Sequence, residues 1–247
     1  TVFYGPGLTF SASATDRVSG VDTIYISMNG APFQPYGQDI LIDKEGACHV
    51  RVYAVDRVGY AGDVQSLRFT LDLSPPETST RSRGPAGASM TASGTLIELA
   101  ATDNLTGPRQ TYYRLDDQNE FSTYKNSPIS LKRLEEGEHS ISYYSVDHVG
   151  NREEQKRFDF YLDKTPPRVE AAITGDHFNK DGKDYISART PIRITAEDNK
   201  GGIKHIRYSI DGENDATDEN VYTEPFSIKG KPGNRTVYYE AVDNLDN

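Results

Sequence analysis

Short segments in which apolar and polar residues alternate recur along the whole chain. From Phe10 to Asp16, every second residue is apolar or small until the row ends on an aspartate. The segment from Val50 to Asp56 alternates in the same way and also ends on an aspartate. Alternation with period two is typical of β-strands with one buried face, and almost no helical periodicity occurs. The chain is therefore predicted to be all-β, with an acid at the inward end of particular strands.

Both alternating segments occur three times, always in the same order. A third pattern, in which a strand runs through a turn to a tyrosine, lies between them in each copy. Two similar linkers, LDLSPPET at 71–78 and LDKTPPRV at 162–169, separate the copies, so the chain is predicted to hold tandem copies of one unit of about ninety residues. The aligned segments are FSASATDRVSG (10–20), IELAATDNLTG (97–107) and IRITAEDNKGG (192–202), and EGACHVRVYAVDRVG (45–59), EGEHSISYYSVDHVG (136–150) and PGNRTVYYEAVDNLD (232–246).

Each copy has the strands and turns of a β-sandwich, because about seven short strands per copy are typical of that fold. Asn29-Gly30 and Asp211-Gly212 have the composition of tight hairpin turns. Pro75-Pro76 and Pro166-Pro167 cannot donate hydrogen bonds to a sheet and interrupt it. We therefore predict three modules, which we call repeat 1 (1–74), repeat 2 (75–165) and repeat 3 (166–247).

The repeated segments resemble the bacterial immunoglobulin-like and fibronectin-type-III-like repeats found in tandem on exported envelope and surface proteins. The resemblance rests on ATDRVSGV at 14–21, FQPY at 33–36, YSVDHVGN at 144–151, the LDKTPP linker at 162–167 and YSIDG at 208–212. It spans essentially the whole chain. It implies three Ig-like β-sandwich modules, a place outside the cytoplasm in the periplasm or at the cell surface, and a non-catalytic role.

Charge and cysteine content exclude several classes of protein. Lys and Arg number 27 against 37 for Asp and Glu, and the net charge of −10 disfavours nucleic acid or an anionic membrane as a partner. No apolar run reaches the length of about 20 residues that a membrane span needs, so no direct membrane insertion by this chain is expected. Cys48 is the single cysteine, which excludes an internal disulfide, and its position in the alternation predicts a buried thiol.

The aspartates that end the inward rows are the main candidate site residues. In a sandwich of this type the two strands run in the same direction on opposite sheets, so their final acids meet at one rim. The strand before each linker then brings a third acid to the rim of the following repeat. Two interpretations remain open, loop capping by the acids and a calcium site at each junction between repeats. The candidate metal ligands are Asp72, Asp103 and Asp147, and Asp163, Asp198 and Asp243.

Other candidate sites are weaker. The segment 211–219 has acids spaced as in a calcium-binding loop, but Ala216 and Tyr222 stand where such a loop needs glycine and an acid. We interpret it, and the similar segment 176–184, as solvated hairpin extensions. The five histidines have no metal-ligand spacing and form no recognisable nucleophile or acid–base set with a serine. No catalytic residue is predicted, and the chain is not expected to be an enzyme.

We expect these repeats to act as a spacer and as a protein-interaction or adhesion module within a larger bacterial protein. The alternative is that they accompany a secreted or surface enzyme acting on polysaccharide. A partner protein, other domains of the same polypeptide and a glycan remain open as ligands. The first and last repeats each have too few residues for one strand. We expect that the missing strand of repeat 3 comes from residues beyond Asn247 or from a partner.

Overall fold

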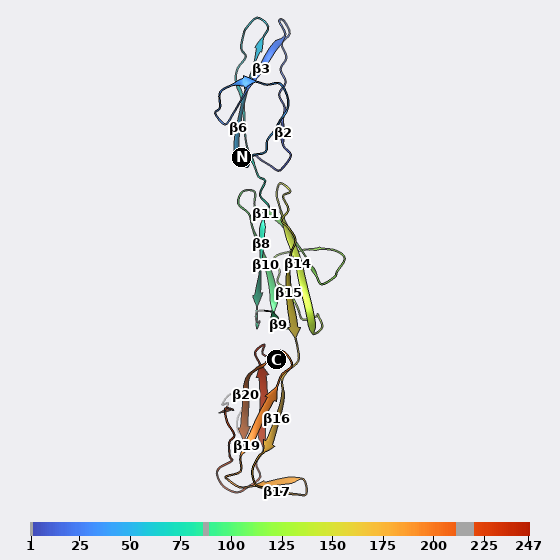
Figure 1. The fold of residues 1–247 in the computed structure, drawn as a ribbon, viewed down its shortest axis with the longest axis vertical. Coiled ribbons are helices and arrows are strands. Elements are labelled where there is room, and N and C mark those ends of the chain that lie inside the picture. The colour runs from blue at the N-terminus through green and yellow to red at the C-terminus, as the bar shows by residue number, and fades with distance from the viewer. Residues whose placement is uncertain (1, 86–88, 211–219) are drawn as a thin grey trace. The chain divides into compact units, whose positions relative to one another are not determined.

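The computed structural model of the chain describes residues 2–85, 89–210 and 220–247 (Figure 1). Every regular element in these ranges is a β-strand, which confirms the all-β class. No helix in the described part is long and apolar enough to cross a membrane. The hairpin extension predicted at 211–219 lies outside the described residues.

The chain divides into two compact units, and the division runs through repeat 2. Strands β8, β10 and β14 of that repeat have residues in both units. The boundaries of three separate modules therefore stay a prediction. One unit holds Thr1–Thr80, Leu99–Asn126 and Ile141–Arg157, and the other holds Arg81–Glu98, Ser127–Ser140 and Phe158–Asn247.

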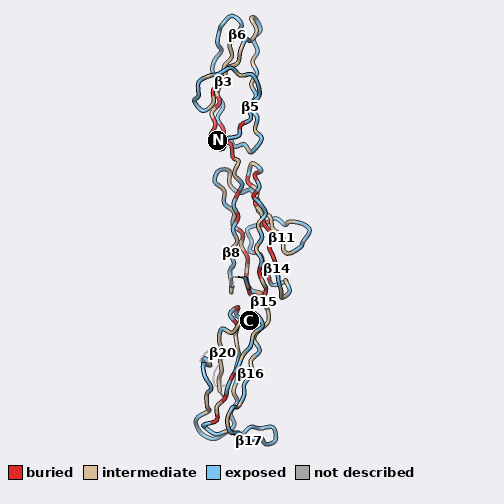
Figure 2. The backbone as a smooth tube through the Cα atoms, in the orientation of Figure 1, coloured by how far each residue is buried: buried red, intermediate tan, exposed pale blue. Residues whose placement is uncertain are grey.

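Repeat 1 forms two sheets with an apolar core between them. The five-stranded sheet has the order β1-β7-β6-β3-β4, and β2 pairs with β5. Ile26, Val50 and Leu71 are almost fully buried, and Cys48, the thiol predicted to be buried, packs in the same cluster. Figure 2 colours the buried stretches of the backbone red. The strands are β1 (Phe3–Tyr4), β2 (Thr9–Phe10), β3 (Val21–Met28), β4 (Gln34–Pro35), β5 (Ile40–Leu41), β6 (Gly46–Asp56) and β7 (Gln65–Leu71).

Repeat 2 shows the strand division of an Ig-like sandwich. One sheet has the order β13-β10-β8, and the other has the order β12-β11-β14-β15-β9. Strands β8, β10 and β13 therefore lie in a different sheet from β11, β14 and β15, as in an Ig-like sandwich. Ile97 and Leu99 of β10 are buried, as the alternation predicts. The strands are β8 (Glu77–Arg83), β9 (Met90–Ala92), β10 (Leu96–Thr102), β11 (Pro108–Leu115), β12 (Ser122–Thr123), β13 (Ile129–Ser130), β14 (Gly137–Asp147) and β15 (Lys156–Asp163).

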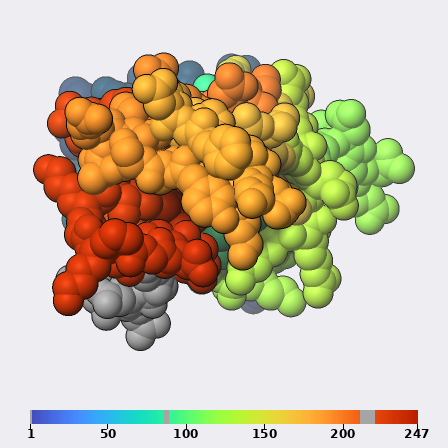
Figure 3. Space-filling view, turned by 90° about the horizontal axis from the view of Figure 1, so that it is seen from below, coloured from blue at the N-terminus to red at the C-terminus, as the bar shows by residue number. Residues whose placement is uncertain are grey.

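Repeat 3 contains the pair β16-β19, the three-stranded sheet β21-β20-β22 and the hairpin β17-β18. The hairpin confirms the extension predicted at 176–184. Its side chains are exposed except that of Ile186, and atoms of this part of the chain lie uncovered in the space-filling view (Figure 3). The strands are β16 (Arg168–Ile173), β17 (His177–Lys180), β18 (Lys183–Ile186), β19 (Ile192–Glu197), β20 (Ile203–Ile210), β21 (Asn220–Val221) and β22 (Val237–Asp243).

Turns and linkers follow the predicted chemistry, with one correction. Asn29 and Gly30 both have positive φ, at 50° and 85°, as a tight hairpin between strands requires. The strands on the two sides of each Pro-Pro linker belong to different sheets. The expectation that Asp16 faces inward is wrong, because β2 ends at Phe10 and the residues after it leave the sheet, so that Asp16 is exposed.

Candidate metal centres

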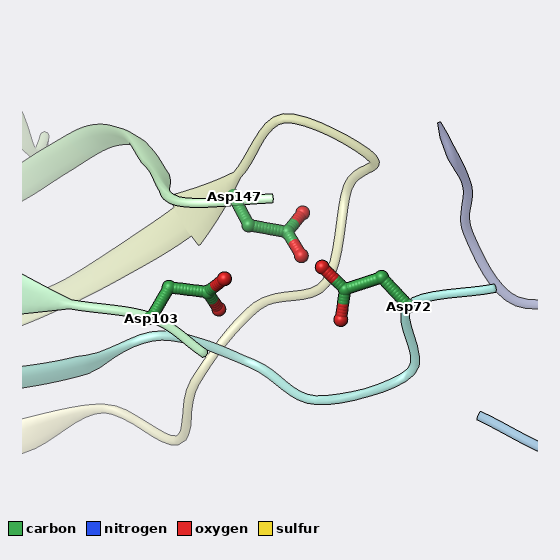
Figure 4. Close-up of side chains that lie close together, drawn as sticks. All are labelled: Asp72, Asp103 and Asp147. Carbon is green, nitrogen blue, oxygen red and sulfur yellow. The ribbon is translucent and has the colours of Figure 1, made fainter. Parts of the chain in front are cut away.

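The predicted acids converge in two groups of three carboxylates. In the first triad, which consists of Asp72, Asp103 and Asp147, one oxygen from each residue lies within 4.8 Å of the others. Figure 4 shows the three carboxylates pointing toward one another, with Asp72 facing the other two. The second triad, Asp163, Asp198 and Asp243, meets the same limit. Each triad lies inside one compact unit, and metal binding by either stays a prediction.

Strand ends place each carboxylate at the rim. Asp147 and Asp243 are the last residues of β14 and β22, and each is paired across the sheet beside a β-bulge, at Pro108/Gln110 and Ile203/His205. A bulge bends its strand and re-aims the neighbouring side chains. Asp103 and Asp198 directly follow β10 and β19, while Asp72 and Asp163 lie where β7 and β15 end. The same local geometry therefore builds both triads from three strand ends each.

One oxygen of each rim carboxylate caps a loop. Asp147 Oδ1 accepts hydrogen bonds from the backbone N–H groups of Val149, Gly150 and Asn151, at 2.9, 2.6 and 2.8 Å. Asp103 Oδ1 accepts from the amides of Leu105 and Gly107. In the second triad, Asp198 Oδ1 and Asp243 Oδ1 each accept two loop amides in the same way. The loop-capping interpretation predicts these hydrogen bonds from loop amides to the carboxylates.

Three of the other carboxylate oxygens have no partner in the described part of the chain. Within the described ranges, Asp103 Oδ2, Asp163 Oδ2 and Asp198 Oδ2 are buried and have no hydrogen-bond partner. Asp163 is fully buried, and this burial raises the pKa of its carboxyl, with the negative charges of Asp198 and Asp243 acting in the same direction. At Asp103 and Asp198, capping and cation binding are therefore compatible, because they use different oxygens of the same carboxylate.

Asparagines tie the rim to the preceding strand. Asn151 Nδ2 donates to Asp147 Oδ2 at 2.7 Å and to the carbonyl oxygen of Asp72 at 3.0 Å. Asn247 makes the equivalent bonds to Asp243 Oδ2 and to the carbonyl of Asp163, at 3.0 and 3.3 Å. Each asparagine thus holds together two of the three acid-bearing segments.

Repeat 1 provides an internal contrast, because the described residues place two acids, Asp16 and Asp56, at its rim. Asp16 Oδ1 and Asp56 Oδ1 cap loops as in the other repeats, but the Ser19 hydroxyl donates to Asp56 Oδ2 at 2.8 Å. The pKa values of both carboxyls are lowered, chiefly by the amides of Gly20 and Tyr60 respectively. Tyr60 stands where repeat 2 has Asn151. Among the described residues, this rim therefore shows no buried carboxylate oxygen without a partner.

A second repeated arrangement holds the linkers, and the sequence analysis missed it. Glu45 Oε2 accepts from Leu73 N and Ser74 Oγ at 3.0 and 2.6 Å, and its Oε1 accepts from Asn104 Nδ2 at 3.4 Å. Glu136 bonds in the same way to Lys164 N, to the Thr165 hydroxyl and to Asn199, and the Thr165 hydroxyl is the largest cause of the lowered pKa of Glu136. We call these glutamates the linker clamps.

The sequence carries a signal for the clamps. Both glutamates begin an aligned EG segment, and repeat 3 has Pro232 in that place. Their asparagine partners, Asn104 and Asn199, follow the rim aspartates of the next repeat, where repeat 1 has Arg17. The asparagine is thus present in the two repeats that follow a clamp glutamate.

Replacing Glu136 by alanine is expected to lower stability by about 1–3 kcal/mol, because the Lys164 amide, the Thr165 hydroxyl and the Asn199 amide group lose their acceptor. Since Thr165 N also donates to Asp163 Oδ1, the change is expected to weaken cation binding at the second triad. Urea denaturation measures the first effect and calcium titration the second. The matched control is Glu135→Ala at the exposed neighbouring position, which is expected to change neither. An unchanged titration of the Glu136→Ala protein would contradict the link between clamp and triad.

The chemistry of the triads fits a hard cation. All three donors in each triad are carboxylate oxygens, which calcium and magnesium prefer. Asp72, Asp147, Asp163 and Asp243 are fully buried, so a bulky substrate cannot reach these carboxylates in this structure. Calcium takes 6–8 oxygens at 2.3–2.6 Å and tolerates irregular geometry, so water molecules would complete its coordination.

No protein-family model matches the chain, and no curated protein matches its sequence. Among solved structures, it is similar to the fibronectin(III)-like modules of Clostridium thermocellum CbhA, with a TM-score of 0.34 and 12% identity over 66% of this chain and 90% of that chain. It is also similar to the FN1–FN3 domains of chicken CNTN1, at 0.35 and 10%, over 98% and 94%. A third similar structure belongs to a 1.5-MDa bacterial ice-binding adhesin, at 0.35 and 13%, over 99% and 83%. The similar structures thus include fibronectin-III-like modules and part of an adhesin.

Proposed function

We propose that this chain is a non-catalytic, extracytoplasmic repeat region of a larger bacterial protein, which acts as a spacer whose repeats are held together by calcium at the two triads. Its main partners are the other domains of the same polypeptide. The observation that carries the proposal is the convergence of three carboxylates from two successive repeats, with buried oxygens that have no partner in the described part of the chain.

Electrostatics explains why such a triad favours a cation. Like charges brought together in a buried place raise each other's cost of ionisation, and an uncompensated buried charge is strongly destabilising. In the second triad this cost is visible in the raised pKa of Asp163. A divalent cation removes most of the repulsion and provides a partner for the free oxygens. The same acids without the ion are a source of instability.

The origin of the three ligands gives the ion its structural role. Two carboxylates of each triad come from the rim of one repeat, and the third comes from the strand that ends the preceding repeat. An ion bound to all three therefore joins the segments on both sides of a Pro-Pro linker. A spacer needs such a restraint, because a linker that few contacts cross leaves neighbouring domains free to move.

A place outside the cytoplasm agrees with this use of calcium. Extracellular calcium modules work with dissociation constants of about 10⁻⁴–10⁻³ M, which suit sites that have few protein ligands. Three carboxylates per site, completed by water, belong to this class. The single buried cysteine is also compatible with an oxidising compartment, since the folded chain offers no exposed thiol there.

Isothermal titration calorimetry with calcium chloride tests the proposal on the whole chain. We expect two ions per chain, and small-angle scattering is expected to show a narrower distribution of dimensions with calcium than with EDTA. The double variant Asp103→Asn, Asp198→Asn is expected to lose both effects, while the matched variant Asp16→Asn in repeat 1 keeps both. No binding heat at millimolar calcium, or equal heats for the double variant and the parent chain, would overturn the proposal.

A further inference from the structure

One of the aligned positions at which the loops beside the two triads differ is Thr106 in repeat 2, which corresponds to Gly201 in repeat 3. The backbone amide of Thr106 donates to Asp72 Oδ2 at 3.0 Å, so both oxygens of Asp72 have a partner, the other being Ser74 N. In the second triad, Asp163 Oδ1 has the equivalent bond from Thr165 N, but its Oδ2 has no partner in the described structure.

Gly201 lets two carboxylates of the second triad lie directly against the backbone. A Cβ atom at Gly201 would lie 2.6 Å from Asp243 Oδ2 and 3.0 Å from Asp163 Oδ2. These distances are shorter than ordinary contacts, so a side chain at this position would displace the two carboxylates from their places in the triad. Gly201 does not have a positive φ, so the feature that matters here is its small size rather than its backbone freedom.

The number of buried carboxylate oxygens without a hydrogen-bond partner also differs between the triads. The second triad has two buried carboxylate oxygens without a partner within the described ranges, Asp163 Oδ2 and Asp198 Oδ2. The first has one, Asp103 Oδ2, and the other buried oxygen without a partner there is the uncharged hydroxyl of Thr106. A carboxylate that already accepts amide hydrogen bonds gains less from an ion. The affinity of oxygen sites for calcium rises with the charge that the ligands offer.

We propose that the second triad binds calcium more tightly than the first, and that Gly201 is the residue that determines this difference. The inference rests on the proposed function of the triads as calcium sites. As the calcium concentration rises, the junction before repeat 3 fills first and the junction before repeat 2 fills later. The two junctions therefore stiffen over different ranges of calcium concentration.

Two single-site variants of the whole chain separate the affinities. Asp103→Asn leaves only the second triad intact, and Asp198→Asn leaves only the first; both substitutions keep a side-chain oxygen for the loop amides. Calorimetric titration with calcium chloride is expected to give a dissociation constant about tenfold lower for the Asp103→Asn chain. Equal constants, or the reverse order, would overturn this inference while leaving the proposed function intact. No binding by either variant or by the parent chain would overturn both.

A second pair of variants tests Gly201 directly. Gly201→Ala, added to the Asp103→Asn chain, places a Cβ against the carboxylates of Asp163 and Asp243 and is expected to weaken binding about tenfold. Thr106→Ser, added to the Asp198→Asn chain, is the matched control, because it keeps both the Cβ and the buried hydroxyl at the aligned position, and its binding is expected to stay within about threefold. Circular dichroism in EDTA checks that each variant folds. If the Gly201→Ala chain folds and its calcium affinity is unchanged, Gly201 does not determine the difference between the triads. If the Gly201→Ala chain does not fold, the comparison of the Asp103→Asn and Asp198→Asn chains still tests the difference in affinity.

Discussion

Chelation of calcium with EDTA is expected to lower the melting temperature of the whole chain by about 5–10 °C for each filled triad. An ion that binds only the folded state at 100 times its dissociation constant adds about 2.7 kcal/mol, and one kcal/mol corresponds to about 2–4 °C in a chain of this length. The unfolded chain does not compete for the ion, because each triad draws its carboxylates from three distant segments. Differential scanning calorimetry at several calcium concentrations measures the shift.

The variant Asp163→Asn distinguishes calcium binding from a nonspecific effect of salt on the melting temperature. The pKa of Asp163 is raised in the folded chain, so its ionised form costs stability at neutral pH when no cation is bound. Removing the charge is therefore expected to raise the melting temperature in EDTA and to abolish the part of the calcium shift that belongs to the second triad. Sodium chloride at equal ionic strength is the control for screening. A parent chain whose melting temperature is the same with calcium and with EDTA would return the acids to loop capping alone.

Replacing Asp147 by alanine is expected to lower the free energy of unfolding in EDTA by about 3 kcal/mol or more. Three loop amides and the Asn151 side chain lose their acceptor, and each buried donor left without a partner costs about 1–3 kcal/mol. Relief of charge repulsion in the triad offsets part of this loss. Urea denaturation in EDTA isolates the capping role, since no ion is then present in either protein.

Asp147→Asn is the control, because its side-chain oxygen still accepts the loop amides while the charge is gone. Its cost in EDTA is expected to be well below that of Asp147→Ala. The corresponding change in repeat 1, Asp56→Ala, is expected to cost less than Asp147→Ala, about 1–2 kcal/mol, because Asp56 is only half-buried and accepts two loop amides. Equal costs for the alanine and asparagine variants at Asp147 would show that the loop hydrogen bonds contribute little.

The fold and the members of both triads follow from local sequence patterns. Period-two alternation identifies the buried faces of β10 and β14, and the common direction of these strands brings Asp103 and Asp147 to one rim. Asp72 lies directly before the Pro75-Pro76 linker, so it is expected at the same rim of repeat 2. Asp16 was expected to face inward for the same reason, but periodicity does not reveal where a strand stops, and β2 ends before it.

The remaining features of the site depend on hydrogen-bond partners, which are determined by the three-dimensional positions of the residues. The separate use of Oδ1 for the loops and Oδ2 for the triad cannot be inferred from a pattern of letters. The linker clamps Glu45 and Glu136 were missed because single-chain alternation gives no reason to pair a glutamate with a segment 28 residues ahead. The small size of Gly201 matters only because two carboxylates lie beside it. These are tertiary constraints on residues that look ordinary in sequence.

The position of Asp72 and Asp163 beside the proline linkers bears on how the chain carries mechanical load. A pulling force applied to the two ends of the polypeptide must pass through both linkers, which are single stretches of backbone. Around each linker, the asparagine bond to the strand-end carbonyl and the clamp glutamate connect the same segments side by side, and an ion held by the triad would add a third connection. These connections must break before the segments on the two sides of a linker can separate, so tension is shared among them and does not fall on the backbone alone.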